Sequence, residues 1–121
     1  MTNETTVKLH KESKNSTSLY IAHDTRLQIK LYKGGYAYIG LLNSDGKYNI
    51  IISSTKLNKN NFLLYKKMKL MTVGKKDRGI RLTIPSTFKE VIGEDIYNEW
   101  IIRVIDFEGT KVIQLSQKSM K

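Results

Sequence analysis

The side chains best suited to chemistry in this chain are cations grouped in one short segment. Residues 74–79 begin and end with glycine and hold Lys75, Lys76 and Arg78. Glycine lets a backbone bend closely enough to approach a row of phosphates. An arginine can fork onto a phosphate or the edge of a guanine, whereas a lysine acts as a point charge. The pattern predicts phosphate anchoring by the two lysines, and groove or base reading by Arg78 and Arg81.

The overall charge favours a polyanionic partner. The 121 residues carry a formal net charge of +10, from 21 lysines and arginines against 11 acidic residues. Such an excess attracts nucleic acid first, with an acidic membrane surface or an acidic protein as weaker candidates. The alternative is that residues 74–79 form a solvated turn whose lysines only keep the protein soluble.

Length and residue usage restrict the fold and the location. A chain of 121 residues fits one domain, or two very small ones that share a core. The sequence has no cysteine, which excludes disulfides, thiolate metal sites and cysteine catalysis. The N-terminal residues lack the apolar core of a signal peptide, and no apolar run approaches membrane-spanning length. We therefore expect a cytoplasmic protein that does not insert into a membrane.

The chain divides into a polar tail and two β-rich segments. The first residues are rich in Lys, Ser, Thr and Asn without a sustained apolar period, which predicts a flexible tail. Runs of β-branched and aromatic residues then predict strands at 19–21, 27–32, 36–42 and 48–52. The predicted boundaries are 1–18 for the flexible polar tail, 19–57 for an N-terminal β-rich segment and 62–117 for a second β-rich segment, with a polar connection at 55–61.

One short helix is predicted after the only proline. Pro85 has no backbone donor, which suits the first turn of a helix. Thr87 and Glu90 have the spacing of a capping box, and Gly93 is a natural left-handed stop. The fold class is therefore mostly β with one short helix. Residues at i, i+3 and i+4 would form its apolar face: Phe88, Val91 and Ile92.

A hairpin is predicted over residues 100–116, with Glu108-Gly109 in its turn. Both faces of its first strand are mostly apolar, so this strand needs cover on both sides. Interleaving with a second copy, from the N-terminal half or from another chain, would supply that cover. The first half holds a similar turn, Asp45-Gly46, and a faint internal echo aligns residues 19–29 with 71–78 and 81–84. No proline or helix is expected in the first half.

The order of loop, strand, proline, short helix and hairpin resembles the DNA-binding half of the AbrB/SpoVT swapped-hairpin family. The resemblance covers roughly residues 68–117 and rests on Arg78-Gly79 to Pro85, on Ile92-Gly93 and on the final strand pair. It implies a transcription regulator built on a swapped-hairpin β-barrel, in which the N-terminal half could be a degenerate second copy. Members usually show a Gly-Asp turn after the helix, and this chain departs from that pattern. The residues that the resemblance places against double-stranded DNA are Lys75, Lys76, Arg78, Arg81 and, on the exposed side of the helix, Lys89.

Other basic residues are weaker candidates for DNA contact. Three lysines interleave with apolar residues, an alternation that is also typical of an edge strand with a wet face. Three further cations would form a matching surface if the halves are duplicated. The tyrosines of the first half could stack on bases, but core and rim packing is the more common use of tyrosine in strands. The secondary DNA-binding candidates are Lys66, Lys67 and Lys69, and Arg26, Lys30 and Lys33.

The sequence indicates a binding protein rather than an enzyme. His10 and His23 have no ligand-spaced companions, so neither a metal nor another cofactor is expected. Nucleophile-elbow and phosphate-binding enzyme motifs are missing as well. The main hypothesis is a DNA-binding regulator that acts as a homodimer, or as a pseudo-dimeric monomer. The alternative is a protein-binding module on the same fold, such as an antitoxin of the MazE type or a phage or mobile-element inhibitor of a host protein.

Overall fold

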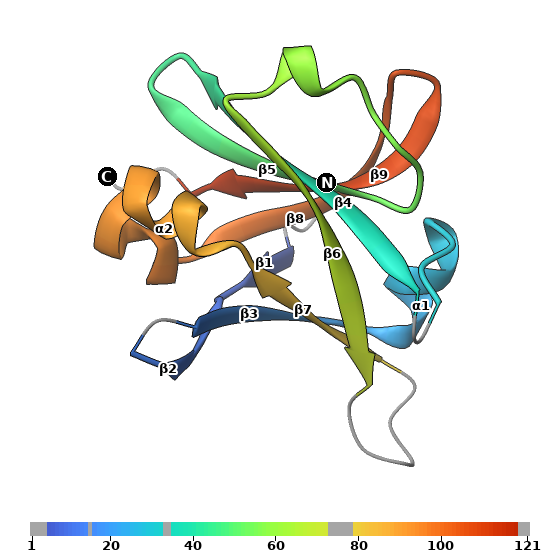
Figure 1. Ribbon diagram of the computed structural model, residues 1–121, viewed down its shortest axis with the longest axis horizontal. Coiled ribbons are helices and arrows are strands. Elements are labelled where there is room, and N and C mark those ends of the chain that lie inside the picture. The colour runs from blue at the N-terminus through green and yellow to red at the C-terminus, as the bar shows by residue number, and fades with distance from the viewer. Residues whose placement is uncertain (1–4, 15, 33–34, 73–78, 119–121) are drawn as a thin grey trace.

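The computed structural model describes residues 5–14, 16–32, 35–72 and 79–118 of the chain. This part is mostly β, as predicted, and its nine strands form one antiparallel sheet that spans the chain and curls strongly (Figure 1). The strands are β1 (Thr5–Val7), β2 (His10–Ser13), β3 (Ser16–Ile21), β4 (Tyr36–Ser44), β5 (Lys47–Ser53), β6 (Leu64–Thr72), β7 (Ile80–Ile84), β8 (Trp100–Phe107) and β9 (Thr110–Gln117). The helices are α1 (His23–Gln28) and α2 (Ser86–Ile92), with 3-10 turns η1 (Lys59–Asn61) and η2 (Gly93–Tyr97).

The order of the strands brings the two edges of the sheet together. The order is β1-β8-β9-β5-β4-β6-β7-β3-β2, so β1 and β2 are the outermost strands. Only Lys8 and Leu9 separate these two strands in the chain. The long strand β6 makes a similar connection across the sheet, because residues 64–69 pair with β4 and residues 70–72 pair with β7. The sheet therefore curls around a single interior.

The two hairpin turns with an acid followed by glycine are confirmed. Asp45 and Gly46, between β4 and β5, have φ of 53° and 82°. Glu108 and Gly109, between β8 and β9, have φ of 52° and 81°. Two successive left-handed residues give the turn whose twist matches that of the flanking strands. Local sequence chemistry therefore specifies both hairpins.

The predicted helix after the proline is also present. Pro85 is the residue before α2, and Gly93 ends the helix with φ of 80°. The predicted capping box between Thr87 and Glu90 is wrong, because the helix begins at Ser86 and no side chain caps it. Val91 was expected on the buried face but is 44% exposed. No helix among the described residues is long and apolar enough to cross a membrane.

The predicted strand at 27–32 is wrong, and a helix stands in the first half where none was expected. Residues 23–28 form α1, and Leu27 is 46% exposed while Ile29 and Leu31 are buried. A strand would have placed these three residues on one face. This segment does not pair with β4, because β5 and β6 occupy both sides of that strand, and β6 and β7 separate β3 from β4 in the sheet. The chain has to cross over, and α1 lies in that crossing.

The expected tail is a pair of strands over its described residues. β1 pairs with β8, β2 pairs with β3, and the first residues of β3 also belong to this segment. Leu9, between β1 and β2, is buried. Backbone hydrogen bonds along the neighbouring strands hold the polar residues in place without an apolar period. A pattern search misses such strands because their side chains give no alternating signal.

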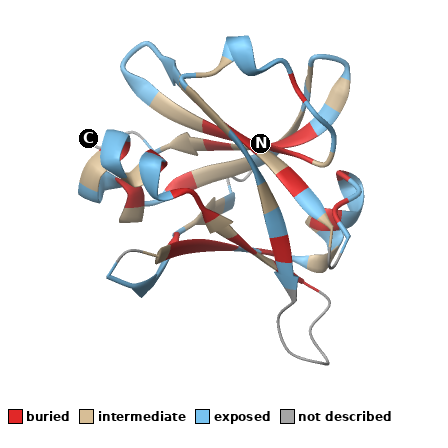
Figure 2. Cartoon of the chain, viewed as in Figure 1, coloured by how far each residue is buried: buried red, intermediate tan, exposed pale blue. Residues whose placement is uncertain are grey.

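The main hydrophobic core fills the interior of the curled sheet (Figure 2). Trp100 and Phe88 are among its largest fully buried side chains, and the Trp100 indole donates a hydrogen bond of 2.9 Å to the carbonyl oxygen of Ile96. A smaller second cluster centres on Ile51, Leu57 and Val112. Strand β8 contributes to both: Ile102 and Val104 pack against the main core, and Ile105 and Phe107 against the second cluster. Both of its apolar faces thus find cover within one chain.

From β3 onward, the second half of the chain repeats the strand pairing of the first half at an offset of 63 residues. In β3 and β7, Leu19 lies opposite Leu82, and 82 minus 19 is 63. In β5 and β9, Ile51 lies opposite Gln114, and 114 minus 51 is also 63. The starts of α1 and α2, at His23 and Ser86, differ by the same number. We call two residues equivalent when they are 63 positions apart in the two halves. Leu19 and Ile51 each pair with their own equivalent residue, and such a pair lies on a two-fold axis. The pairing pattern therefore has internal two-fold symmetry.

The same offset relates other parts of the two halves. It relates the two hairpin turns, and also Lys30 with φ of 60° to Gly93 with φ of 80°. The offset falls to 61 before β3, because Lys66 and Thr5 pair with the equivalent residues Ile39 and Ile102. The predicted alignment of residues 19–21 with 71–73 is therefore replaced by an alignment with 82–84.

Replacing Leu82 by alanine should strongly destabilise the fold. Leu82 is fully buried at the central strand pair, and removing such a side chain typically costs about 2–5 kcal/mol. The control is Leu27→Ala on the exposed face of α1, for which a change within about 0.5 kcal/mol is expected. Urea unfolding followed by circular dichroism measures both free energies of unfolding. Similar values for the two variants would contradict the placement of Leu82 at the centre of the core.

Candidate nucleic-acid interface

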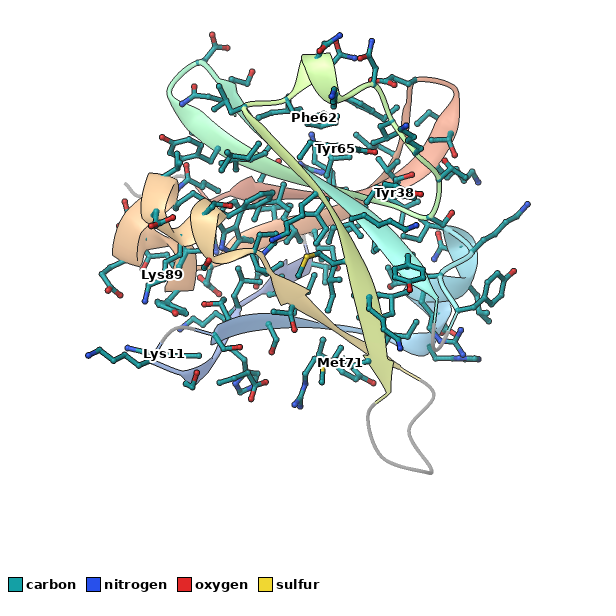
Figure 3. The ribbon with its side chains drawn as sticks, viewed as in Figure 1. Lys11, Tyr38, Phe62, Tyr65, Met71 and Lys89 are labelled. Atoms are coloured by element: carbon teal, nitrogen blue, oxygen red, sulfur yellow. The ribbon has the colours of Figure 1, made fainter. Side chains whose placement is uncertain are left out.

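Three cations lie on the outer side of two neighbouring strands. The inward residues of β6 and β7, such as Leu70 and Leu82, are buried, so the alternate residues point outward. Arg81 lies between Met71 of β6 and Tyr20 of β3 in the strand register. Met71 and Tyr20 are 51% and 42% exposed. We call this surface the outer strip, and its residues are Lys67, Lys69, Met71, Arg81 and Tyr20; Figure 3 labels Met71 near the end of β6.

Arg81 contacts the carboxylate of Glu12 on β2. The Arg81 Nη1 atom lies 3.2 Å from Glu12 Oε1, and the Ser18 hydroxyl donates a hydrogen bond of 2.7 Å to the same oxygen. The hydrogen bond from Ser18 is the main cause that lowers the pKa of Glu12; desolvation opposes it, and the charges of Arg81 and His10 add to the lowering. The guanidinium is therefore held across β3 by an anion, as it would be by a phosphate oxygen.

Lys67 lies over two tyrosine rings of β4. Its Nζ atom is 4.4 Å from the centre of the Tyr36 ring and 5.8 Å from the centre of the Tyr38 ring. The Tyr38 ring stacks on Tyr65 with 6.1 Å between ring centres (Figure 3). A cation over an aromatic face keeps its charge while its position is restricted. These tyrosines therefore position a lysine on the outer strip.

Gly79 is needed for packing in the structure. A Cβ atom at this position would overlap the ring of Tyr20. Gly79 itself is buried, and Ile80 directly after it begins β7. This glycine was expected to let the backbone approach phosphate closely. In the structure, the space is filled by an aromatic side chain of the outer strip.

The other predicted DNA-binding residues lie elsewhere. Arg26 is buried, and its Nη1 atom donates a hydrogen bond of 3.0 Å to the carbonyl oxygen of Leu31, so it is a structural residue of α1 rather than a surface cation. Lys66 is exposed but points to the opposite side of β6 from Lys67, and Lys30 is exposed just beyond α1. Four predicted residues lie outside the described part of the chain: Lys33, Lys75, Lys76 and Arg78.

Lys89 belongs to a separate basic cluster beside α2. Its Nζ atom is 5.3 Å from the centre of the Tyr97 ring, and that of Lys11 is 5.9 Å from the same ring (Figure 3). The Tyr97 hydroxyl shares a hydrogen bond of 2.8 Å with the hydroxyl of Thr17. Thr17 is an inward residue of β3, whereas Tyr20 points outward, so this cluster and the outer strip lie on different sides of the sheet.

Sequence reasoning missed Glu12 and Lys11 as site residues because it assigned them to a tail. One local signal could have found them. Residues 16–21 are typical of a strand, because apolar residues stand at alternate positions at their end. Lys14-Asn15, just before them, has the composition of a tight turn. Extending the hairpin backwards from that turn would have made residues 10–13 a strand beside β3, although the register shift between Lys11 and Ser13 that brings Glu12 to Ser18 has no sequence signal.

The comparisons with known proteins give no identification. No family model, no curated protein and no solved structure matches this chain. The resemblance to the AbrB/SpoVT family therefore remains a prediction from the sequence. What the structure defines is a small, mostly β protein with a basic and aromatic strip on one side of its sheet.

Removing the Ser18 hydroxyl should raise the pKa of Glu12. The hydrogen bond from Ser18 is its largest cause of lowering, so Ser18→Ala should raise the pKa more than Arg81→Ala does. Since the folded pKa lies below the unfolded one, the stabilisation by Glu12 is present above the unfolded pKa and is lost as the pH falls through the folded pKa. An NMR titration of the Glu12 side-chain carboxyl carbon measures these values. A larger rise in Arg81→Ala would reverse the assigned order of causes.

Proposed function

We propose that this protein binds double-stranded DNA through the outer strip, as a transcription regulator of the AbrB-like type. The observation that carries the proposal is the grouping of Lys67, Lys69 and Arg81 on the outer side of β6 and β7. These strands are neighbours within the sheet, so their outward cations share one surface that a row of phosphates could contact. The sequence that joins them, residues 73–78, adds three cations and one acid. Phosphate contacts from this surface would position the protein on the duplex.

An AbrB-like swapped-hairpin architecture is supported by the way the two halves interleave. The hairpin of β6 and β7 lies between β4 and β3 of the first half, and the two-fold pattern repeats this arrangement with β2 and β3. Identical residues recur at the offset of 63, among them the pairs Leu19 and Leu82, Ile21 and Ile84, Ile39 and Ile102, and Gly46 and Gly109. We therefore interpret the chain as two diverged copies in one polypeptide, which gives a pseudo-dimeric monomer.

The ion pair with Glu12 leaves Arg81 available to DNA. The side chains of Arg81 and Glu12 are 39% and 35% exposed. An exposed pair of this kind contributes little to stability, because water and salt screen both charges. A phosphate can therefore replace the carboxylate at little cost. Until then, Glu12 keeps the guanidinium extended over the strip.

Binding to duplex DNA should weaken steeply as salt rises. Each phosphate that the protein neutralises contributes about −0.9 to the slope of log Kobs against log salt. The three cations of the outer strip alone would give a slope of about −2.7. Fluorescence anisotropy with a labelled duplex at salt concentrations of about 50–200 mM measures the slope. No binding at low salt, or a flat response, would reject the proposed function.

Replacing Lys67, Lys69 and Arg81 together by alanine should flatten this slope by about 2–3 and weaken binding accordingly. The matched control removes three exposed lysines at turns away from the strip: Lys47, Lys59 and Lys111. Both variants lose the same charge, so a general effect of net charge would weaken them equally. We expect the control to keep most of the wild-type slope, with both thermal transitions close to that of the wild type. Equal losses would remove the outer strip as the DNA contact.

A further inference from the structure

We infer that the two halves of this chain are unequal DNA-binding arms, so that one chain binds a duplex in one orientation through its second half. The inference rests on the proposed function. We call residues 66–72 with 79–81 the strong arm, and residues 5–11 with 16–18 the weak arm. Strand pairing makes these sets equivalent, at an offset of 61 before the hairpin turn and 63 after it.

The two arms differ in charge at equivalent positions. The strong arm has four cations, Lys66, Lys67, Lys69 and Arg81, and no acid. The weak arm has only two cations, Lys8 and Lys11. Of the outer-strip cations, only Lys69 has a basic equivalent, Lys8; the equivalents of Lys67 and Arg81 are Thr6 and Ser18.

The residues around these positions also make the weak arm less positive than the strong arm. Thr6 donates a hydrogen bond of 3.3 Å to the carboxylate of Glu99, and Glu99 stands at the position equivalent to Tyr36. The strong arm therefore has a lysine over a tyrosine ring where the weak arm has a threonine beside an acid. Ser18 likewise donates its hydroxyl to Glu12. A phosphate approaching Thr6 of the weak arm would meet Glu99, whereas at the equivalent position of the strong arm it would meet Lys67.

A single chain makes this inequality possible. In a homodimer every substitution appears at both symmetric positions, so the two arms stay equal. With both copies in one polypeptide, one arm can keep its cations while the other loses them. The shared core still holds both arms, because Leu70 and its equivalent Leu9 are both buried. Such a protein suits a DNA site without two-fold symmetry, whereas a symmetric dimer matches a palindrome.

The test removes three cations from the strong arm and three from the side of the weak arm, where Lys14 lies between the two stretches of that arm. The strong-arm variant carries Lys67→Ala, Lys69→Ala and Arg81→Ala; the weak-arm variant carries Lys8→Ala, Lys11→Ala and Lys14→Ala, which are all exposed. The charge removed is the same. We expect the salt slope to flatten by about 2–3 in the strong-arm variant and by less than about 1 in the weak-arm variant. Native mass spectrometry should show one chain on a duplex of about one helical turn, roughly 10 base pairs.

A gain of binding gives an independent check. Thr6→Lys with Glu99→Tyr places the lysine and tyrosine of the strong arm onto the weak arm, and the slope should steepen by about 1. Equal losses in the two triple variants, or two chains on the short duplex, would overturn the inequality while leaving the proposed function in place. Absence of duplex binding by the wild-type chain would overturn the proposed function and this inference with it. Thermal unfolding of each variant separates loss of contact from loss of fold.

Discussion

The antiparallel pairing of β3 with β7, centred on Leu19 and Leu82, is the constraint on which the rest of this structure depends. Both side chains are buried in the core, and each strand has a second neighbour on its other side. A two-stranded hairpin is marginally stable alone, because one face has nothing to pack against. At the central pair, each hairpin gains the other half as its cover. The offset of 63 holds at this pair and again where β5 pairs with β9, so the two halves meet with the same two-fold relation at both places.

The same strands carry the core on one side and the candidate interface on the other. Alternation places Leu70 and Leu82 inside while Lys69 and Arg81 face outward. The cations therefore stand on backbone fixed by the most buried part of the molecule. Such a base positions charges better than a mobile loop would, and it needs no ordering when a partner binds. The proposed recognition of DNA thus rests on the strand pairing rather than on a separate site.

Candidate site residues were predictable where charge alone identified them. Arg81, in a strand bounded by glycine and proline, was predicted from its type and its position, and the structure places it on the outer strip. Arg26 was grouped with the surface cations, but its guanidinium binds a backbone carbonyl oxygen inside the fold. Glu12 was not considered, although it pairs with Arg81. The sequence does not show what surrounds a charged side chain. Only the elements that pack around it decide whether its charge faces solvent, a carboxylate or a carbonyl group.

The sequence by itself determined the two acid-glycine turns, the hairpins that they close, and the short helix between Pro85 and Gly93. These features depend on backbone conformations that a few adjacent residues prefer, so local chemistry is enough to specify them. Only the tertiary structure decided that residues 5–7 and 10–13 form strands, that residues 23–28 form a helix, and which strands of the two halves pair. In these segments the stabilising groups are backbone partners and apolar neighbours from distant parts of the chain, and one-dimensional patterns do not contain them.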